Sequence, residues 1–428
     1  MKKTLIAALL SVAFLGACGG GSDSTTSTAG QQNPGTEQPA PTPPVQAGTS
    51  TGILTDGPVG GVQYTTSGGY SGVTGADGSY AYNPGETVTF KIGAITLGTV
   101  TATGTVTPLD LAAAAAAGDK ENVSTNLLVL LQSLDADGDA SNGITINDNT
   151  KTAAANASID LTLPPATFAS SANSALTTVM NGGGVAKTAP VTEADALAHF
   201  RTEFFKQLAG GWVAKDAEGA IAIRIGLQGN YIIGEVGEAV GEGHSGTEVA
   251  KIDWNPKTGQ VSLVPSSLVH DSNGDWGLDQ INGSEVFKVD GDKFTVTDAD
   301  GTVTTFERVA NDPASIVGMW ALDTASAMSR QHFTFFPDGT YLMADPKGDD
   351  EAIADGRTPC SLGGVEYGNY TFDAATGVLA VTSVAVDTNN CAGAWDSEAQ
   401  QGLSAAISFS EDKSTFSLGD RTFYRVSK

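Results

Sequence analysis

Thr305-Phe306-Glu307-Arg308-Val309 and Thr422-Phe423-Tyr424-Arg425-Val426 are two versions of one short pattern. Both segments alternate polar and apolar residues, as a half-buried β-strand does. Each segment closes a series of other short segments that recur in the same order. The pattern therefore marks the end of a repeated structural unit.

The anchors of this repeat extend over the last half of the chain. They are Gly211-Trp212 with Met319-Trp320, Gly229-Asn230-Tyr231-Ile232 with Gly339-Thr340-Tyr341-Leu342, Lys251-Ile252-Asp253-Trp254 with Asn369-Tyr370-Thr371-Phe372, Val269-His270-Asp271-Ser272-Asn273 with Ala385-Val386-Asp387-Thr388-Asn389, Trp276 with Trp395, and Asp292-Lys293-Phe294-Thr295-Val296 with Lys413-Ser414-Thr415-Phe416-Ser417-Leu418. Chance does not preserve order over so many anchors. We predict two homologous domains, residues 210–312 and 313–428.

The spacing of hairpin turns within each repeat predicts six to eight antiparallel strands. Such a set forms either a sandwich or a closed up-and-down barrel. The early tryptophan and late arginine resemble the barrel-closing pair of lipocalin-like proteins, in which the arginine packs across the indole. The resemblance implies that Trp212 pairs with Arg308, and Trp320 with Arg425.

A barrel of this size is either filled by its own side chains or holds one small ligand. Interiors filled by Trp212, Trp254, Phe306 and their counterparts would count against a ligand carrier. A large connected apolar cavity would favour one.

The first residues, 1–18, have the features of a secretory signal. Lys2 and Lys3 precede the apolar run Leu5 to Leu15, which is shorter than the roughly 20 residues of a spanning helix. The following Leu15-Gly16-Ala17-Cys18 resembles the bacterial lipoprotein cleavage motif. That resemblance implies that Cys18 becomes the acylated N-terminus and attaches the chain to a membrane.

Residues 19–50 contain five prolines in a Ser, Thr, Gly and Gln background, without an aromatic residue, Leu or Ile. Such a segment cannot bury enough apolar surface to offset the cost of ordering. We predict a disordered tether. By resemblance to sorted lipoproteins, Gly19 favours the outer membrane. The sequence does not indicate which leaflet the chain faces.

Residues 51–108 alternate short β-favouring runs with turn pairs, which predicts a small antiparallel sandwich. Asp56-Gly57-Pro58-Val59, with Thr74-Gly75-Ala76-Asp77-Gly78-Ser79-Tyr80 behind it, resembles carboxypeptidase-regulatory-like sandwiches. In that family the domain is a spacer or adhesive module. The fold class we predict is mainly β, with a β-sandwich, a helical connector and two antiparallel barrel or sandwich domains in tandem.

The helical connector is predicted for residues 109–209. The alanine run Ala112 to Ala117 and the leucines of Asn126 to Leu134 predict a helix packed on the sandwich. Thr192-Glu193-Ala194-Asp195 opens a second helix, as a variant of the capping box, and Gly210-Gly211 ends it.

An acidic loop follows the first of these helices. Asp135, Asp137, Asp139 and Asn142 offer oxygen ligands at the spacing that can surround Ca²⁺. The resemblance to an EF-hand loop is partial, because Ile146 stands where a bidentate Glu belongs. The alternative is an acidic turn that ends a helix and binds no metal.

Charge and cysteine content restrict the partners. The 48 acidic against 22 basic side chains give a formal charge of −26, which repels nucleic acid.

Cys360 and Cys391 form the remaining cysteine pair in an exported chain, so we expect a disulfide between them. The alternative of two free thiols at a metal or redox site lacks a third ligand or a Cys-x-x-Cys spacing.

Motifs for catalysis are scarce. His199, His244, His270 and His332 form no zinc motif, and the loop-like Gly243-His244-Ser245-Gly246-Thr247 falls short of a nucleophile elbow.

Taken with the signal and the tether, this scarcity leads us to expect an outer-membrane lipoprotein that binds cell-surface polysaccharide or protein without catalysis. The alternatives are a hydrophobic-ligand carrier and a surface hydrolase, which would need His244 or His332 beside a nucleophile and an acid.

Overall fold

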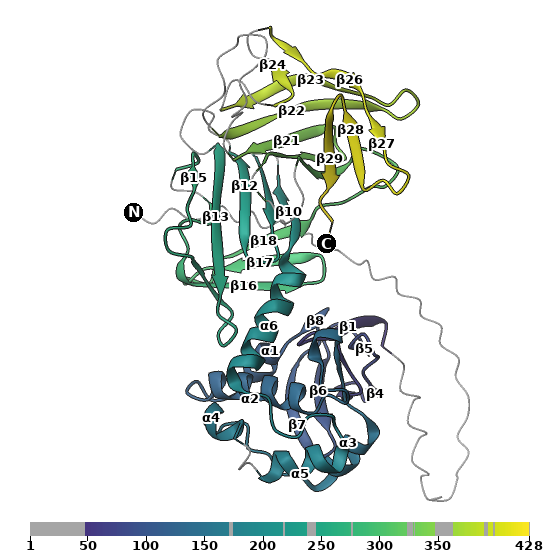
Figure 1. The fold of residues 1–428 in the computed structure, drawn as a ribbon, viewed down its shortest axis with the longest axis vertical. Coiled ribbons are helices and arrows are strands. Elements are labelled where there is room, and N and C mark those ends of the chain that lie inside the picture. Colours follow the sequence, from purple (N-terminus) through teal and green to yellow (C-terminus); the bar gives the residue numbers. More distant parts are fainter. Residues whose placement is uncertain are drawn as a thin grey trace, which may run out of the picture.

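The computed structural model describes residues 48–170, 174–216, 219–237, 245–274, 277–322, 328, 330–346, 363–388, 393–396 and 399–427. It confirms the predicted fold class. Small N-terminal sheets are followed by a helical region and by two antiparallel barrel-like sheets (Figure 1). Within the described ranges, no helix combines the length and the apolar character that crossing a membrane requires.

The N-terminal strands form three small sheets. One contains β5 (Ser79–Tyr82), β1 (Ser50–Leu54) and β8 (Thr105–Val106); a second contains β4 (Ser71–Val73), β3 (Gln63–Thr66), β6 (Thr87–Ile92) and β7 (Ile95–Thr101); the third pairs β2 (Val59–Gly60) with β9 (Ile144–Thr145).

The prediction of a purely antiparallel sandwich was wrong, because β1–β8 and β2–β9 are parallel pairs. A parallel pair needs a long crossover connection. The β2–β9 crossover runs through the first helices, so the strands and the helical region share one apolar core.

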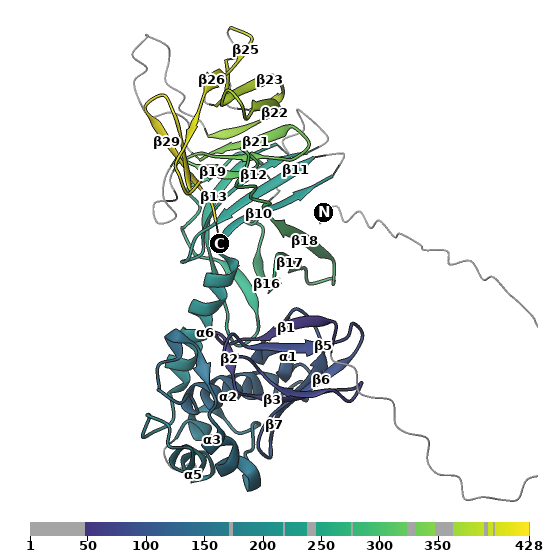
Figure 2. The same ribbon diagram turned by 90° about the vertical axis from the view of Figure 1, so that its right-hand side faces the viewer.

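The helical region follows the N-terminal sheets and covers one side of them (Figure 2). Its elements are α1 (Pro108–Ala112), α2 (Lys120–Ser133), the 3₁₀ turn η1 (Ala140–Asn142), α3 (Asp148–Ala153), the 3₁₀ turn η2 (Ala154–Asn156), α4 (Pro165–Phe168), α5 (Ser174–Gly183) and α6 (Glu193–Leu208). Thr192 caps α6 as predicted, since its hydroxyl accepts the backbone N–H of Asp195 (3.1 Å).

The expected helix through the alanine run does not exist. Helix α1 ends at Ala112 and α2 begins only at Lys120, and the alanines between them form turns. Alanine has high helix propensity but little apolar surface to bury, so tertiary packing overrides the propensity. The leucines of α2 are fully buried and determine where that helix lies.

Eight strands of the first repeat form a closed antiparallel ring in the described part of the chain. They are β10 (Gly210–Lys215), β11 (Ala220–Ile225), β12 (Asn230–Val236), β13 (Gly246–Trp254), β14 (Gln260–Leu263), β16 (Asn282–Asp290), β17 (Lys293–Thr297) and β18 (Val303–Arg308), with the short β15 (His270–Asp271) added to β13. The pairing of β10 with β18 closes the ring. We call this ring barrel 1.

The second repeat forms a nine-stranded sheet that nearly closes. Its strands are β19 (Gly318–Ala321), β20 (His332–Phe335), β21 (Thr340–Asp345), β22 (Gly364–Asp373), β23 (Val378–Asp387), β26 (Ser404–Ala406), β27 (Ser408–Phe409), β28 (Thr415–Leu418) and β29 (Arg421–Arg425), and a hairpin of β24 (Trp395–Asp396) and β25 (Gln401–Gly402) lies beside them. The edges left open are β26 and β27. We call this sheet barrel 2.

Side chains fill the interior of barrel 1, and helix α6 packs against the aromatic residues at one end. Trp212, Trp254 and Phe306 are each at most 2% exposed. Phe204 of α6 stacks on Trp254 with ring centroids 3.9 Å apart, and Phe200 meets the same indole edge-on at 5.2 Å. The helix is therefore part of the barrel core and also its connection to the N-terminal region (Figures 1 and 2).

The two barrels pack wall against wall. Outward-facing residues of β12 and β21, among them Ile232 and Leu342, belong to one apolar cluster. A Cβ at Gly234 would lie 2.6 Å from the Cβ of Ala344, so the absence of a side chain there permits the close approach. Lys215 crosses to barrel 2, where it pairs with Asp338. The barrels therefore form one unit.

We predict that Trp254→Ala will lower the free energy of unfolding by about 3–5 kcal/mol, because it removes a buried indole and the surface on which α6 packs. Urea denaturation followed by circular dichroism measures the change. Leu227→Ala is the matched control, since Leu227 is 61% exposed and its loss should cost about 0.5 kcal/mol or less. Equal effects of the two substitutions would contradict this account of α6.

Candidate functional site

The predicted tryptophan–arginine pair of barrel 1 joins its first and last strands. The Arg308 guanidinium carbon lies 3.9 Å from the ring centroid of Trp212, and the two residues are opposite one another on β18 and β10. The indole N–H donates to the carbonyl oxygen of Leu208 (2.7 Å). Arg308 donates to the carbonyl oxygens of Gln207 (2.8 Å) and Ala209 (3.1 Å). The pair thus fixes the end of α6 to the barrel.

Barrel 2 repeats this arrangement. The Arg425 guanidinium carbon lies 4.0 Å from the ring centroid of Trp320. The indole N–H donates to the Ile316 carbonyl (2.7 Å), and Arg425 donates to the carbonyls of Val317 (3.1 Å) and Ser315 (3.3 Å). These polar atoms are used within the chain, which makes the pair a structural element and not a ligand site.

A second repeated constellation lies inside the barrels. In barrel 1 the hydroxyl of Tyr231 donates to Oε1 of Glu248, on the neighbouring strand. Oε2 of Glu248 accepts the backbone N–H of Leu278 (2.9 Å), which belongs to the loop after β15. A Cβ at Gly277, where φ is +99°, would collide with the same carboxylate. Only glycine lets this loop approach so closely.

The same constellation occurs in barrel 2. The hydroxyl of Tyr341 donates to Oε1 of Glu366. The backbone N–H groups of Ala394 and Trp395 donate to the two oxygens of Glu366, each over 3.1 Å. Gly393, with φ +136°, lies against the carboxylate as Gly277 does in the first copy. We call the two constellations the tyrosine–glutamate anchors.

A hydroxyl group fixes the start of each loop. Oγ of Ser272 accepts the backbone N–H of Thr247 (2.9 Å), and Oγ1 of Thr388 accepts that of Val365 (2.9 Å). Each loop is therefore held at two points, by a hydroxyl at its start and by a buried glutamate further along. This correspondence supports the predicted alignment of Asp271-Ser272-Asn273 with Asp387-Thr388-Asn389.

The predicted match of Trp276 with Trp395 stays a prediction, because Trp276 lies outside the described residues. The backbone N–H groups that reach the glutamates come from Leu278 in the first copy and from Ala394 and Trp395 in the second.

Burial controls the protonation of these carboxyl groups. It raises the pKa of Glu248 to about 8 and that of Glu366 to about 7, against the hydrogen bonds from the loops, which favour the ionised form. Burial also raises the pKa of Glu235 to about 7, although the Asn273 amide donates to it over 3.3 Å. Burial therefore keeps a fraction of these groups protonated near neutral pH.

The two repeats carry one sequence signal for the tyrosine–glutamate anchors. Glu248 and Glu366 each stand three residues before a matched segment of the repeat, which begins at Lys251 in the first copy and at Asn369 in the second. Acidic residues are so frequent in this chain that a single glutamate draws no attention. Two glutamates at the same position of an internal repeat are a much stronger signal.

The acidic loop brings together only part of the predicted ligand set. Oδ1 of Asp135 accepts the backbone N–H of Thr145 (2.9 Å), and Oδ2 of Asp137 accepts the side-chain amide of Asn142 (3.0 Å). Asp139 instead accepts the hydroxyl of its neighbour Ser141 (2.6 Å). Among the described residues, no three His, Cys, Asp or Glu side chains could hold a metal ion together.

The histidines are dispersed. His332 is fully buried at the contact between the barrels, and burial together with the nearby charge of Arg224 lowers its pKa to about 3. His199 lies 2.8 Å, through Nε2, from the carbonyl oxygen of Asp56 in the N-terminal region. His244, Cys18, Cys360 and Cys391 lie outside the described residues.

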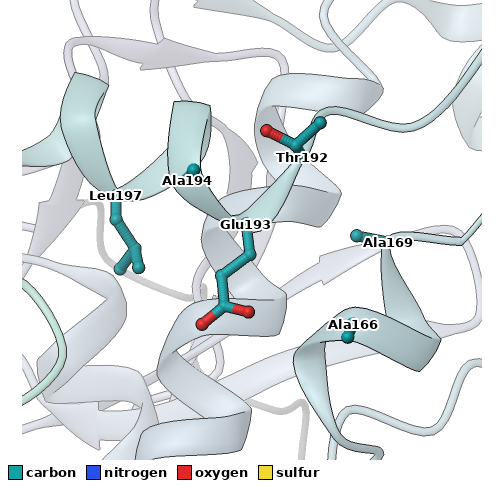
Figure 3. Close-up of a pocket in the computed structure, with 6 residues that line it drawn as sticks. All are labelled: Ala166, Ala169, Thr192, Glu193, Ala194 and Leu197. Atoms are coloured by element: carbon teal, nitrogen blue, oxygen red, sulfur yellow. The ribbon is translucent and has the colours of Figure 1, made fainter.

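A surface pocket of about 510 Å³ lies between α4 and the start of α6 (Figure 3). It is lined by Ala166, Ala169, Thr192, Glu193, Ala194 and Leu197. Its polar side chains have partners elsewhere: Thr192 bonds to Asp195, and Glu193 pairs with Lys257 (2.5 Å). The pocket offers an apolar surface without a reactive group.

Comparison of the chain with models of protein families, with curated proteins and with solved structures found no match. The fold and the anchors define the class as a mainly β protein with an eight-stranded antiparallel barrel and a nearly closed nine-stranded one.

We predict that stability falls as pH rises from about 4.5 to about 8. Because the folded-state pKa of Glu248 and Glu366 lies above the ordinary value of 4.5, the folded protein binds more protons than the unfolded chain in this window. Each group contributes up to about 1.4 kcal/mol per pH unit while it is protonated only in the folded state. Urea titrations at several pH values measure the slope.

Glu248→Gln should flatten this slope, because glutamine stays neutral at every pH and keeps an acceptor for the loop. Glu307→Gln is the control, since Glu307 lies exposed on β18. A wild-type stability that rises between pH 5 and pH 8 would contradict the buried, protonated anchors.

Proposed function

We propose that the chain is a lipoprotein, acylated at Cys18, that residues 19–50 tether to the outer membrane. It binds a partner at the cell surface and catalyses no reaction. The partner is a polysaccharide or a protein; the net charge of −26, which repels phosphate backbones, argues against nucleic acid. The Cys360–Cys391 disulfide expected for an exported chain is part of the proposal.

The observation that carries this proposal is the filling of the barrels. In barrel 1, Trp212, Trp254 and Phe306 occupy the interior and α6 packs against it. In barrel 2, Trp320, Phe416 and other aromatic residues form the corresponding core. A ligand would then contact the outer surface and not an enclosed cavity, which favours a binding protein over a carrier.

The environment of His332 also favours binding over hydrolysis. A general base near neutral pH needs a pKa near the working pH. His332 is buried between the barrels, and its pKa of about 3 keeps it neutral. It is therefore poorly suited to the role that a hydrolase would require.

The proposed acylation predicts where the Cys18→Ala variant is found in the cell. Without the acceptor thiol, no acyl chain is added, and the chain should move from the membrane fraction to the soluble fraction after export. Membrane fractionation and metabolic labelling with a fatty-acid analogue measure this. Cys391→Ala, which keeps Cys18, should stay acylated. An unlabelled wild-type chain in the soluble fraction would overturn the proposed anchor.

The binding part predicts that cells displaying the wild-type chain attach to glycan- or protein-coated surfaces more strongly than cells with Cys18→Ala. The purified full chain should compete with that attachment. Equal attachment of both strains, together with a glycan array on which the full chain binds nothing, would overturn an adhesive role.

A further inference from the structure

We propose that one end of barrel 2 binds an amphipathic helix of a partner protein. This end is formed by the turns at residues 336–340, 373–377 and 410–414, and we call it the uncapped end. The inference deepens the proposed binding function and rests on it in one respect, namely that the chain binds a protein. The pattern for the contact lies within the molecule, because α6 covers the equivalent end of barrel 1 (Figure 1).

Backbone hydrogen bonds show that the two barrel ends are equivalent. In barrel 1 the N–H of Ile252 donates to the carbonyl oxygen of Gly229 (2.9 Å). In barrel 2 the N–H of Tyr370 donates to the carbonyl oxygen of Gly339 (2.8 Å). The two glycine turns therefore occupy the same place in each barrel, and so do the strands β13 and β22 that pass them.

In barrel 1, α6 is attached to this place by apolar and charged contacts. A Cβ at Gly229 would lie 3.0 Å from the ring of Phe205, which is 1% exposed. Nη2 of Arg201 donates to Oδ1 of Asp253 on β13 (2.5 Å). The helix thus covers both the turn and the neighbouring strand.

Barrel 2 lacks such a helix. Within the described ranges, no helix follows α6 along the chain. Apart from its chain neighbours, a Cβ at Gly339 would meet only a backbone carbonyl oxygen, at 3.6 Å. Phe204 of α6 stands eight residues before Trp212, whereas the residue eight positions before Trp320 is Asp312. The chain therefore enters barrel 2 without the aromatic residues that close barrel 1.

The surface at the uncapped end is aromatic. Phe372 occupies the position of Trp254, two residues beyond the matched hydrogen bonds, but it is only partly buried. Its ring meets that of Phe409 edge-on, with centroids 6.0 Å apart, and Phe409 lies 5.8 Å from the buried Trp320. Partly exposed rings that continue into a core are the kind of surface on which binding energy concentrates.

The charge around the uncapped end favours a basic partner. The ammonium group of Lys413 lies 5.0 Å from the ring centroid of Phe409. The turns around this end expose four carboxylates, those of Asp312, Asp373, Glu411 and Asp412. An excess of carboxylates at a rim attracts a basic partner.

The partner helix should repeat the spacing that α6 uses. Phe200 and Phe204 of α6 are four positions apart, and residues at this spacing lie on one face of a helix. We therefore expect a helix with two aromatic or large aliphatic residues at this spacing and basic residues beside them. Recognition of a helix by its apolar face is a common mode of peptide binding. For this surface, the inference selects a protein over a polysaccharide.

The probe is a synthetic peptide of residues 192–209 with Glu193→Lys and Glu203→Lys, which has one acidic and four basic residues in place of three and two. Calorimetry with the full chain should give one site, because α6 already covers the end of barrel 1. The same peptide with Phe200→Ala and Phe204→Ala should bind at least about tenfold more weakly. The unmodified peptide should also bind more weakly, since its acidic residues face an acidic rim.

Variants of the full chain locate the site. Phe372→Ala should weaken peptide binding about tenfold, and Glu411→Lys about threefold with less dependence on salt. Neither side chain is fully buried, so both variants should fold, which circular dichroism checks. Val303→Ala is the matched control, because Val303 is 47% exposed on β18 of barrel 1 and its loss should leave binding unchanged.

Failure of this inference can be told apart from failure of the proposed function. No binding of the basic peptide, or binding that Phe372→Ala leaves unchanged, would overturn the inference even where cells still attach to coated surfaces. Dimerisation in sedimentation that Phe372→Ala abolishes would also overturn it, because the occupant would be a second copy. Peptide binding that depends on Phe372, in a chain that mediates no attachment, would support the inference and overturn the adhesive role alone.

Discussion

The stacking of an arginine on a tryptophan is the interaction on which each barrel depends. Arg308 lies on the last strand of barrel 1 and Trp212 on the first, so their contact lies where the sheet meets itself. A sheet that closes has no unpaired edge at that position. Because the guanidinium group also binds the carbonyls at the end of α6, ring closure and helix attachment share one side chain.

The tyrosine–glutamate anchors solve the complementary problem at the loops. A long loop across a barrel has few apolar contacts, so it needs specific polar contacts to remain in place. Glu248 and Glu366 provide an acceptor within the barrel, and the adjacent glycines let the backbone reach it. Both copies have these contacts.

Sequence periodicity and internal comparison predicted the parts of the fold that local patterns determine. The order of the repeat, the start of α6 at Thr192 and the mainly β class follow from residues close together in the chain. The parallel pairs β1–β8 and β2–β9 could not be predicted this way, because they depend on which distant segments meet. The alanine run failed for a related reason, since propensity is weak where nothing is buried. The anchors were missed because burial, and not residue type, distinguishes Glu248 from the other acidic residues.

The contact between the barrels joins equivalent elements. Strand β12 of barrel 1 packs on β21, its counterpart, and Gly234 meets Ala344, which occupies the same position in the second copy. Such self-complementary contact is the mark of a twofold-symmetric homodimer. The two barrels of this chain thus meet as the subunits of such a dimer do. Because one chain carries both barrels, their contact does not depend on protein concentration.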